Sequence, residues 1–197
     1  MLSRLPSQRG VTLIELMIGL VIMAIVLGFG VPSFSNFIQS SHIRNAAEAV
    51  QNGLSLARSE AVRRNTQVKF VLGTGSSWSV GCVTADPDNC PDPITSRDAA
   101  EGSSKASVTT SEVVASTNAA VASPAFTDTL VFNGLGRERT LPPANNAVFD
   151  ITNPDGGTCV AAGGKMRCLR VVVTPGGQIR MCDPAIPAAT PPNPQAC

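Results

Sequence analysis

A single acidic residue stands inside an apolar run near the start of the chain. Glu15 is the only charged residue between Val11 and Val31, a stretch of 21 residues. A carboxylate at membrane depth costs on the order of 2.5–3.5 kcal/mol on insertion scales, and such residues usually have a specific partner. We therefore expect Glu15 to be stabilised by a cation that is also held near the start of this segment.

The length and the flanks of the run indicate a membrane span. As a helix rising 1.5 Å per residue, residues 11–31 would extend about 31 Å, the thickness of the hydrocarbon core of a bilayer. Arg4 and Arg9 precede the run, so the positive-inside rule places the N-terminus in the cytoplasm and the rest of the chain across the membrane. No Ala-x-Ala site follows the run, which argues against an ordinary secretory signal.

The string Arg-Gly-Val-Thr-Leu-Ile-Glu-Leu, residues 9–16, resembles the processing site of type IV prepilins and type II secretion pseudopilins. The resemblance implies that a prepilin peptidase cleaves between Gly10 and Val11 and methylates the new amino terminus of Val11. It also implies that Glu15 pairs with the terminal ammonium of a neighbouring subunit during filament assembly. Such a pair would select the register of the helices as well as stabilise them.

Two later strings, residues 130–137 and 171–182, resemble the FimT and GspH branch of the same family. This resemblance implies an α+β fold, in which a long N-terminal transmembrane helix continues into a helix packed on a C-terminal antiparallel β-sandwich. It implies a minor pilin that takes part in assembly and initiation at the tip of a type IV pilus, or a minor pseudopilin of a type II secretion system. The expected partners are other pilin or pseudopilin subunits, the prepilin peptidase and the inner membrane, with the domain in the periplasm.

Four segments are expected along the chain. They are a cleaved leader (1–10), the transmembrane half of a helix (11–31), its soluble amphipathic half (32–64) and a β-rich globular domain with disulfides (65–197). In the second half of the helix, apolar residues recur at spacings of 4, 3, 4, 3 and 4 and so form one apolar stripe. This stripe predicts that the helix packs on a sheet. The stripe comprises Ile43, Ala47, Val50, Leu54, Ala57 and Ala61.

Gly28, Gly30 and Pro32 lie at the junction of the two halves of the helix. Proline removes a backbone donor and clashes with the preceding turn, so a kink is expected there. The family resemblance implies a hinge that extends when the subunit enters a filament. Membrane helices also tolerate glycine and proline without such a role, and the sequence leaves both interpretations open.

Beyond residue 65 the apolar period changes to two, which predicts strands. Residues 67–72 and 78–82 should form a hairpin around the glycine-containing turn at 73–76. Further strands are expected at 129–133, 147–152, 166–174 and 178–182, with one or two weak strands within 107–122. The stretch from 86 to 129 is the least regular, and we expect a long loop there.

Six cysteines all follow the membrane segment, in the compartment where disulfides persist. They are Cys82, Cys90, Cys159, Cys168, Cys182 and Cys197. Fifteen pairings are possible for six cysteines. The sequential set, Cys82 with Cys90, Cys159 with Cys168 and Cys182 with Cys197, is the simplest because each bond closes a short local loop.

Three arginines are candidates for a weak contact with DNA. FimT-type minor pilins bind DNA through a glycine-arginine-x-arginine motif, and the matching place here reads Gly177-Gln178-Ile179-Arg180, without the first arginine. A similar string, which contains Arg137 and Arg139, carries a glutamate in its middle. Without its leader the chain has 13 basic and 14 acidic residues, so a general affinity for nucleic acid is not indicated. We expect these arginines to form a solvated face, with DNA binding in transformation as the alternative.

The sequence favours neither an enzyme nor a cofactor or metal site. His42 is the only histidine, and no CxxC pair, nucleophile motif or phosphate loop is present. Asp86, Asp88 and Asp92 alternate as calcium ligands can, but Pro91 stands where the calcium loop requires glycine. No cofactor and no small-molecule substrate are therefore expected.

Overall fold

The structure is a computed structural model that describes residues 10–122, 126–187 and 193–197, without the side chains of residues 29–36. The leader, residues 1–9, lies outside this description. The chain divides into two compact units, Met1–Phe37 and Ile38–Cys197, and each is treated by itself below.

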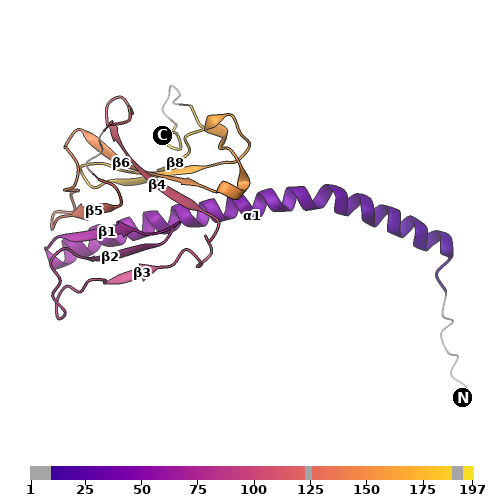
Figure 1. The fold of residues 1–197 in the computed structure, drawn as a ribbon, viewed down its shortest axis with the longest axis horizontal. Helices are drawn as coiled ribbons and strands as arrows, with labels where there is room; N and C mark the ends of the chain where they lie inside the picture. The colour runs from indigo at the N-terminus through magenta and orange to yellow at the C-terminus, as the bar shows by residue number, and fades with distance from the viewer. Residues whose placement is uncertain (1–9, 123–125, 188–192) are drawn as a thin grey trace, which may run out of the picture. The chain divides into compact units, whose positions relative to one another are not determined.

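One helix, α1 (Leu13–Arg64), runs through both units and contains 52 residues (Figure 1). This confirms the long helix expected from the sequence. Gly28 lies within α1, whereas the side chains of Gly30 and Pro32 fall outside the described residues, so the hinge remains a prediction. Within the part of the chain that is described, no helical stretch has the length and apolarity needed to span a membrane.

The apolar stripe on the second half of α1 is buried as predicted. All six of its residues have no exposed surface. Gly53 lies on the same face, where a Cβ atom would come within 2.8 Å of the Phe70 ring and 2.9 Å of the Trp78 ring. The absence of a side chain at Gly53 therefore allows the helix to approach the sheet closely.

The first sheet has four antiparallel strands in the order β3-β2-β1-β5. The strands are β1 (Val68–Leu72), β2 (Trp78–Cys82), β3 (Thr95–Arg97) and β5 (Thr129–Phe132). The predicted hairpin is present, with Phe70 opposite Val80. Strand β3 was missed, because it is only three residues long and lies in the stretch expected to be a loop.

The second sheet is also antiparallel, in the order β4-β6-β7-β8. Its strands are β4 (Ser107–Val114), β6 (Asn145–Thr152), β7 (Leu169–Val173) and β8 (Ile179–Cys182). The expected strand at 166–174 begins later than predicted, because Met166 instead exchanges backbone hydrogen bonds with Thr158 and Val160. Two short 3-10 helices, η1 (Pro154–Gly156) and η2 (Val160–Ala162), precede β7 and were not expected.

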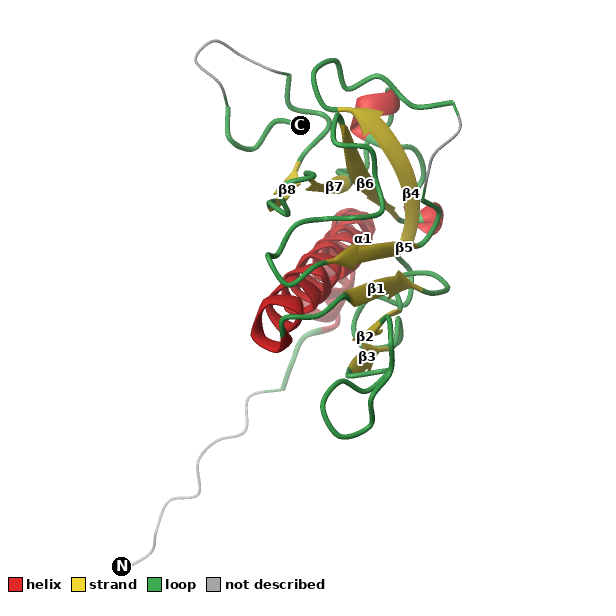
Figure 2. Ribbon diagram, turned by 90° about the vertical axis from the view of Figure 1, so that its left-hand side faces the viewer, coloured by secondary structure: helices red, strands yellow, loops and turns green. Residues whose placement is uncertain are grey.

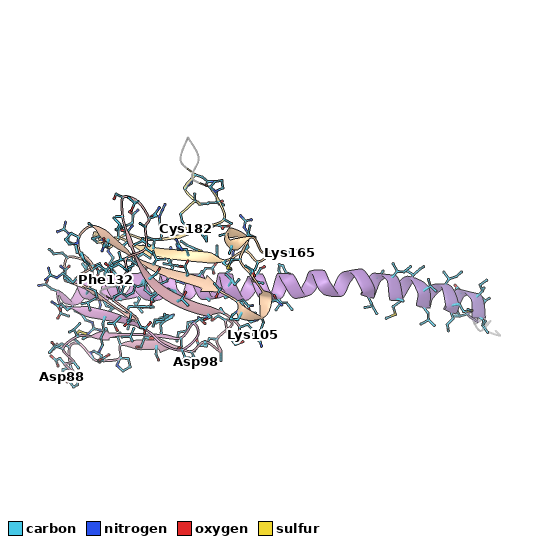
Figure 3. All side chains as sticks on the ribbon, turned by 45° about the horizontal axis from the view of Figure 1, so that its top comes forward. Asp88, Asp98, Lys105, Phe132, Lys165 and Cys182 are labelled. Atoms are coloured by element: carbon cyan, nitrogen blue, oxygen red, sulfur yellow. A yellow bond between two sulfur atoms is a disulfide. The ribbon has the colours of Figure 1, made fainter. Side chains whose placement is uncertain are left out.

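The helix and both sheets share one apolar core. Figure 2 shows α1 beside the inner faces of the two sheets, and the same buried cluster contains residues of all three elements. The rings of Phe70 in the first sheet and Phe149 in the second meet edge to face, with 5.8 Å between their centroids. Phe132 lies in this core as well (Figure 3). The predicted α+β class, a helix packed on antiparallel sheets, is thus observed.

Three disulfides close local loops around this core. They join Cys82 to Cys90, Cys159 to Cys168, and Cys182 to Cys197. This is the sequential arrangement that the spacing of the cysteines suggested. Because the third bond lies on the outer face of the second sheet, beside Val148 and Val172, it attaches the C-terminal tail to that face.

Candidate assembly sites

The start of α1 is capped by Thr12. The backbone N–H of Glu15 donates to the Thr12 hydroxyl oxygen at 3.3 Å, and that of Leu16 donates to the Thr12 carbonyl at 3.2 Å. Thr-x-x-Glu is the sequence pattern of a capping box, a signal that the prediction of the helix start did not use. The pattern fixes the helix start two residues after the expected cleavage position and places Glu15 in the first turn, where the helix dipole favours a negative charge.

Glu15 is exposed, and no described residue gives its carboxylate a hydrogen bond or an ion pair. Val11 lies four positions earlier and is 72% exposed. Gly10 is exposed too, and a Cβ placed on it would meet nothing within 4 Å. The expected cleavage position and the carboxylate are therefore both accessible at this end of the chain, about one helical turn apart along the sequence.

The apolar side chains around Glu15 are also exposed. Thirteen large apolar side chains between Val11 and Leu27 have between 52% and 78% of their surface accessible. They occupy every face of the helix rather than one stripe, and no described part of the chain covers them. A lipid phase or other apolar helices must cover such a surface in water.

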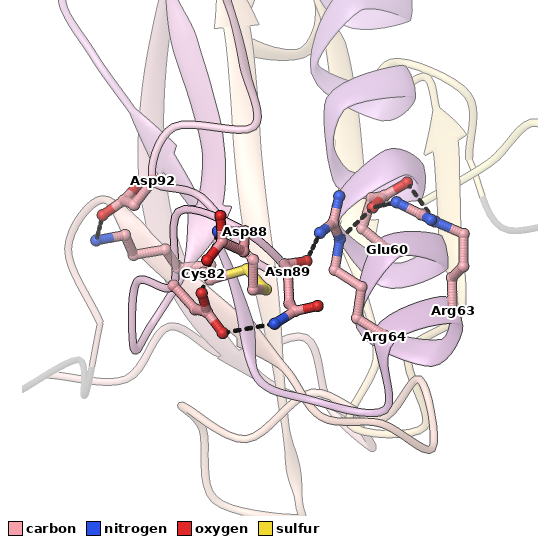
Figure 4. The surroundings of a disulfide bond; sticks show 10 residues. Glu60, Arg63, Arg64, Cys82, Asp88, Asn89 and Asp92 are labelled. Carbon is pink, nitrogen blue, oxygen red and sulfur yellow. Dashed lines mark hydrogen bonds and ion pairs between the residues drawn. A yellow bond between two sulfur atoms is a disulfide. The ribbon is translucent and has the colours of Figure 1, made fainter.

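The other end of α1 is held by a network of charges (Figure 4). The Glu60 carboxylate pairs with Arg63 at 2.6 Å and with Arg64 at 2.7 Å, and Arg64 also donates to the Asn89 carbonyl in the loop closed by the first disulfide. The hydrogen bond from Arg63 lowers the pKa of Glu60, and Glu60 in turn raises the pKa of Arg63. These contacts attach the C-terminal end of α1 to the loop that follows β2.

The structure brings together the two strings that carry the candidate DNA-binding arginines. The loop that carries Arg137 and Arg139 lies against the β7–β8 turn, where Glu138 N–H donates to the Pro175 carbonyl at 3.2 Å. Arg137 and Arg139 are exposed, whereas Glu138 is buried and accepts from the backbone of Leu141. The acidic residue of this string therefore does not share the surface of its arginine neighbours.

Arg180 is exposed on β8, but its guanidinium donates to the Cys197 carbonyl at 3.4 Å. Two further arginines, Arg170 in β7 and Arg167 just before it, have acidic partners. Arg170 binds Asp150 across the β6–β7 ladder at 2.7 Å, and Arg167 binds Asp183 at 2.8 Å. These pairs reduce the positive charge that the second sheet offers to a phosphate backbone.

The calcium alternative gains no support from the described residues. Asp92 pairs with Lys69 at 2.5 Å, and Asp86 accepts hydrogen bonds from Asn89 and Asp88. No group of three or more His, Cys, Asp or Glu side chains that could hold a metal ion is found in the described ranges.

The first half of α1 is apolar and exposed, with an exposed glutamate in its first turn, and the second half is buried on a β-rich domain. This arrangement defines a pilin-like subunit. Residues 5–31 match the family described as a prokaryotic N-terminal methylation motif. Residues 46–177 match the family described as type II transport protein GspH, and the chain belongs to this family. A search of curated proteins found no match.

Three solved structures resemble the chain. Two are crystal structures of the type IV minor pilin FimU from Pseudomonas aeruginosa, with 21% and 20% identity. They cover 74% and 70% of this chain and 91% and 90% of their own, with TM-scores of 0.48 and 0.43. The third is the minor pseudopilin EpsH of the type 2 secretion system of Vibrio cholerae, with 14% identity, coverage of 74% and 99%, and a TM-score of 0.45.

Family membership makes the chain a structural subunit of the pilin and pseudopilin type, and not an enzyme. Such a subunit assembles with other pilin-like subunits, and the N-terminal motif makes it a substrate of a prepilin peptidase. The motif and the family also imply a membrane-anchored periplasmic subunit.

Proposed function

We propose that this chain is a minor pilin that enters the tip of a type IV pilus and takes part in initiating its assembly. Prepilin peptidase cleaves between Gly10 and Val11 and methylates Val11, after which residues 11–31 hold the subunit in the inner membrane. The observation that carries the proposal is the exposed Glu15, which has no partner among the described residues and lies among exposed apolar side chains.

The mechanism follows from the cost of an isolated charge in an apolar phase. Glu15 in a lone subunit has to be hydrated or protonated, whereas in an assembled bundle it can pair with the new ammonium of an adjacent subunit. The pair forms only when the two helices have the correct axial register. Assembly is thus favoured by the covering of apolar surface and is guided by one ion pair.

The processing step is tested by replacing Gly10 with valine in a host with an active prepilin peptidase. Mass analysis of the N-terminus should find a methylated Val11 in the natural chain and an uncleaved leader in Gly10→Val. Gly19→Val is the matched control, because a Cβ atom on Gly19 would also meet nothing within 4 Å and this glycine lies beyond the cleavage motif. An uncleaved natural chain in this host would contradict the proposal.

A second candidate function is a minor pseudopilin of a type II secretion system. The description of the matched family, type II transport protein, favours it. Deletion of the coding sequence separates the two functions. Loss of sheared surface pili with normal protein secretion supports the pilus, whereas loss of secretion with normal pili supports the pseudopilus, and complementation with the natural chain serves as the control.

A further inference from the structure

Among the described residues, the outer edge of β8 is unpaired from Ile179 to Met181, beside α1. Just beyond the strand, the Asp183 N–H donates to the Gln195 carbonyl at 2.8 Å, so the C-terminal tail closes that end of the edge. Strand β8 is the last strand of its sheet. The Thr174 N–H donates to the Gln178 carbonyl, so the alternation of the ladder directs the backbone groups of Arg180 toward β7 and those of Ile179 and Met181 away from it. Within the described residues, the outward groups of Ile179 and Met181 have no hydrogen-bond partner.

A groove of about 420 Å³ adjoins this edge. It is lined by Ser55, Arg58, Ser59, Val62, Arg63 and Ile179, so one wall is the exposed face of α1 and the other is the start of β8. Val62 is 51% exposed although it is apolar. Figure 2 shows β8 as the outermost strand on this side of the second sheet.

The charge of the groove is positive. Arg58 and Arg63 are its two charged lining residues, and no acidic side chain lines it. Arg63 also pairs with Glu60, but Arg63 and Arg64 share this one carboxylate, so this group of three side chains keeps a net positive charge. Arg58 uses its Nε–H for the Gly136 carbonyl at 3.0 Å, which fixes the position of its guanidinium at the groove wall.

From these observations we infer that the groove binds an extended, acidic segment of another filament subunit, which adds as a strand to the free edge of β8. The inference rests on the proposed function, since it supplies the partner surface of a subunit that assembles. Main-chain groups of the segment pair with Ile179 and Met181, while acidic side chains face Arg58 and Arg63.

A peptide strand fits this surface better than a nucleic acid strand does. The unpaired N–H and C=O groups alternate along an edge, and phosphate offers acceptors but no donors for the free carbonyls. The apolar wall at Val62 and Ile179 suits a side chain of a partner protein. The only tryptophan, Trp78, is buried in the core, so it is no stacking platform for bases.

The test uses the full chain in detergent and overlapping 15-residue peptides that cover the soluble domains of the other pilin-like subunits of the host. Binding is measured by fluorescence anisotropy. We expect at least one bound peptide, with net negative charge and with affinity that falls as salt is raised. Absence of binding by every peptide would overturn the inference.

Met181→Pro removes the outward N–H without breaking the ladder to β7, and it should weaken binding roughly tenfold or more. Met181→Ala is the matched control, because it removes the same side chain but keeps the N–H. Equal affinity of the two variants would contradict strand addition. Arg63→Gln should weaken binding of the acidic peptide as well, and unchanged affinity would contradict the role of charge.

A single-stranded oligonucleotide is the last probe. No competition between the oligonucleotide and the bound peptide is expected, and displacement of the peptide at low salt would assign the groove to DNA instead. Cleavage at Gly10 and incorporation of the natural chain into filaments are measured in parallel. Normal incorporation with no peptide binding rejects the groove but leaves the proposed function intact, whereas failed incorporation of the natural chain rejects the function itself.

Discussion

The two halves of α1 differ in how their apolar side chains are buried, although they belong to one helix. Between Val11 and Leu27 the large apolar side chains are exposed on every face, whereas between Ile43 and Ala61 they form one buried stripe. The second half is therefore stabilised by the domain of its own chain, whereas no described residue outside the helix covers the first half. One helix thus contributes to the core of a domain through its second half, and under the proposed function its first half contributes to an assembly.

The largest effect is expected from Glu15→Val. Truncating one partner of a close charge pair typically costs about 2–5 kcal/mol, so incorporation into filaments should fall by more than about tenfold. The variant should still insert in the membrane. Filaments are sheared from cells, and the subunit is quantified in the filament and membrane fractions.

Glu48→Val is the control for Glu15→Val. Glu48 is an exposed glutamate on the second half of the same helix, so its replacement changes the net charge equally. Incorporation of the Glu48→Val variant into filaments should remain normal. If Glu15→Val entered filaments as well as the natural chain does, Glu15 would have no special role in assembly and would not differ from Glu48.

The second effect concerns stability. Leu54 is fully buried, so Leu54→Ala should lower the free energy of unfolding by about 2–5 kcal/mol. Leu20, which is 59% exposed in the first half, is the matched position, and Leu20→Ala should leave the unfolding of the domain nearly unchanged. Denaturant titration of the full chain in detergent, followed by the fluorescence of Trp78, measures both. Equal losses would show that the first half is packed within the chain.

The third effect compares two glycines. Gly53→Ala places a methyl group within 3 Å of the Phe70 and Trp78 rings and should destabilise the domain by about 1–3 kcal/mol, despite the better helix propensity of alanine. Gly19→Ala meets no atom within 4 Å and should cause no loss. The same titration tests the pair, and a stabilising Gly53→Ala would mean that the helix can move away from the sheet.

The smallest effect is expected from Glu60→Gln at the end of the second half. Because Arg63 and Arg64 lower the pKa of Glu60 in the folded state, the carboxylate stabilises the fold above its unfolded pKa of about 4.3. This contribution is lost as the pH falls through the lower, folded value. Glu60→Gln should thus unfold slightly more easily than the natural chain at pH 7, and the difference should disappear once the pH lies below the lowered pKa of Glu60 in the folded state. A difference that does not change with pH would point to packing rather than charge.

Much of the fold could be predicted because its signals are local. The apolar period of 3.6 marked the second half of α1, and the period of two marked β1, β2 and the later strands. The short spacing of the cysteines suggested the observed disulfides. Strand β3 was missed because three residues within a polar loop carry almost no periodic signal, and its pairing with β2 depends on residues far from it in the sequence.

The candidate assembly sites likewise include residues that the sequence predicted and a groove that it did not predict. Gly10, Val11 and Glu15 were predicted from one contiguous string, and the Thr12 cap could have been read from the same residues. The groove beside β8 was not predicted, since it joins Arg58 on the helix to Ile179 more than a hundred residues later. Only the fold brings such residues together.

By itself, the sequence determined the long helix and most of the strands, which face of the helix is apolar, and where one charge interrupts the apolar run. These properties depend on neighbouring residues, whose spacing alone sets the side on which a side chain lies. Only the tertiary structure decided the order of the strands, the burial of Glu138 between two exposed arginines, and the free edge of β8 next to α1. Those features depend on how side chains that are distant in the sequence pack together, and local periodicity does not predict that packing.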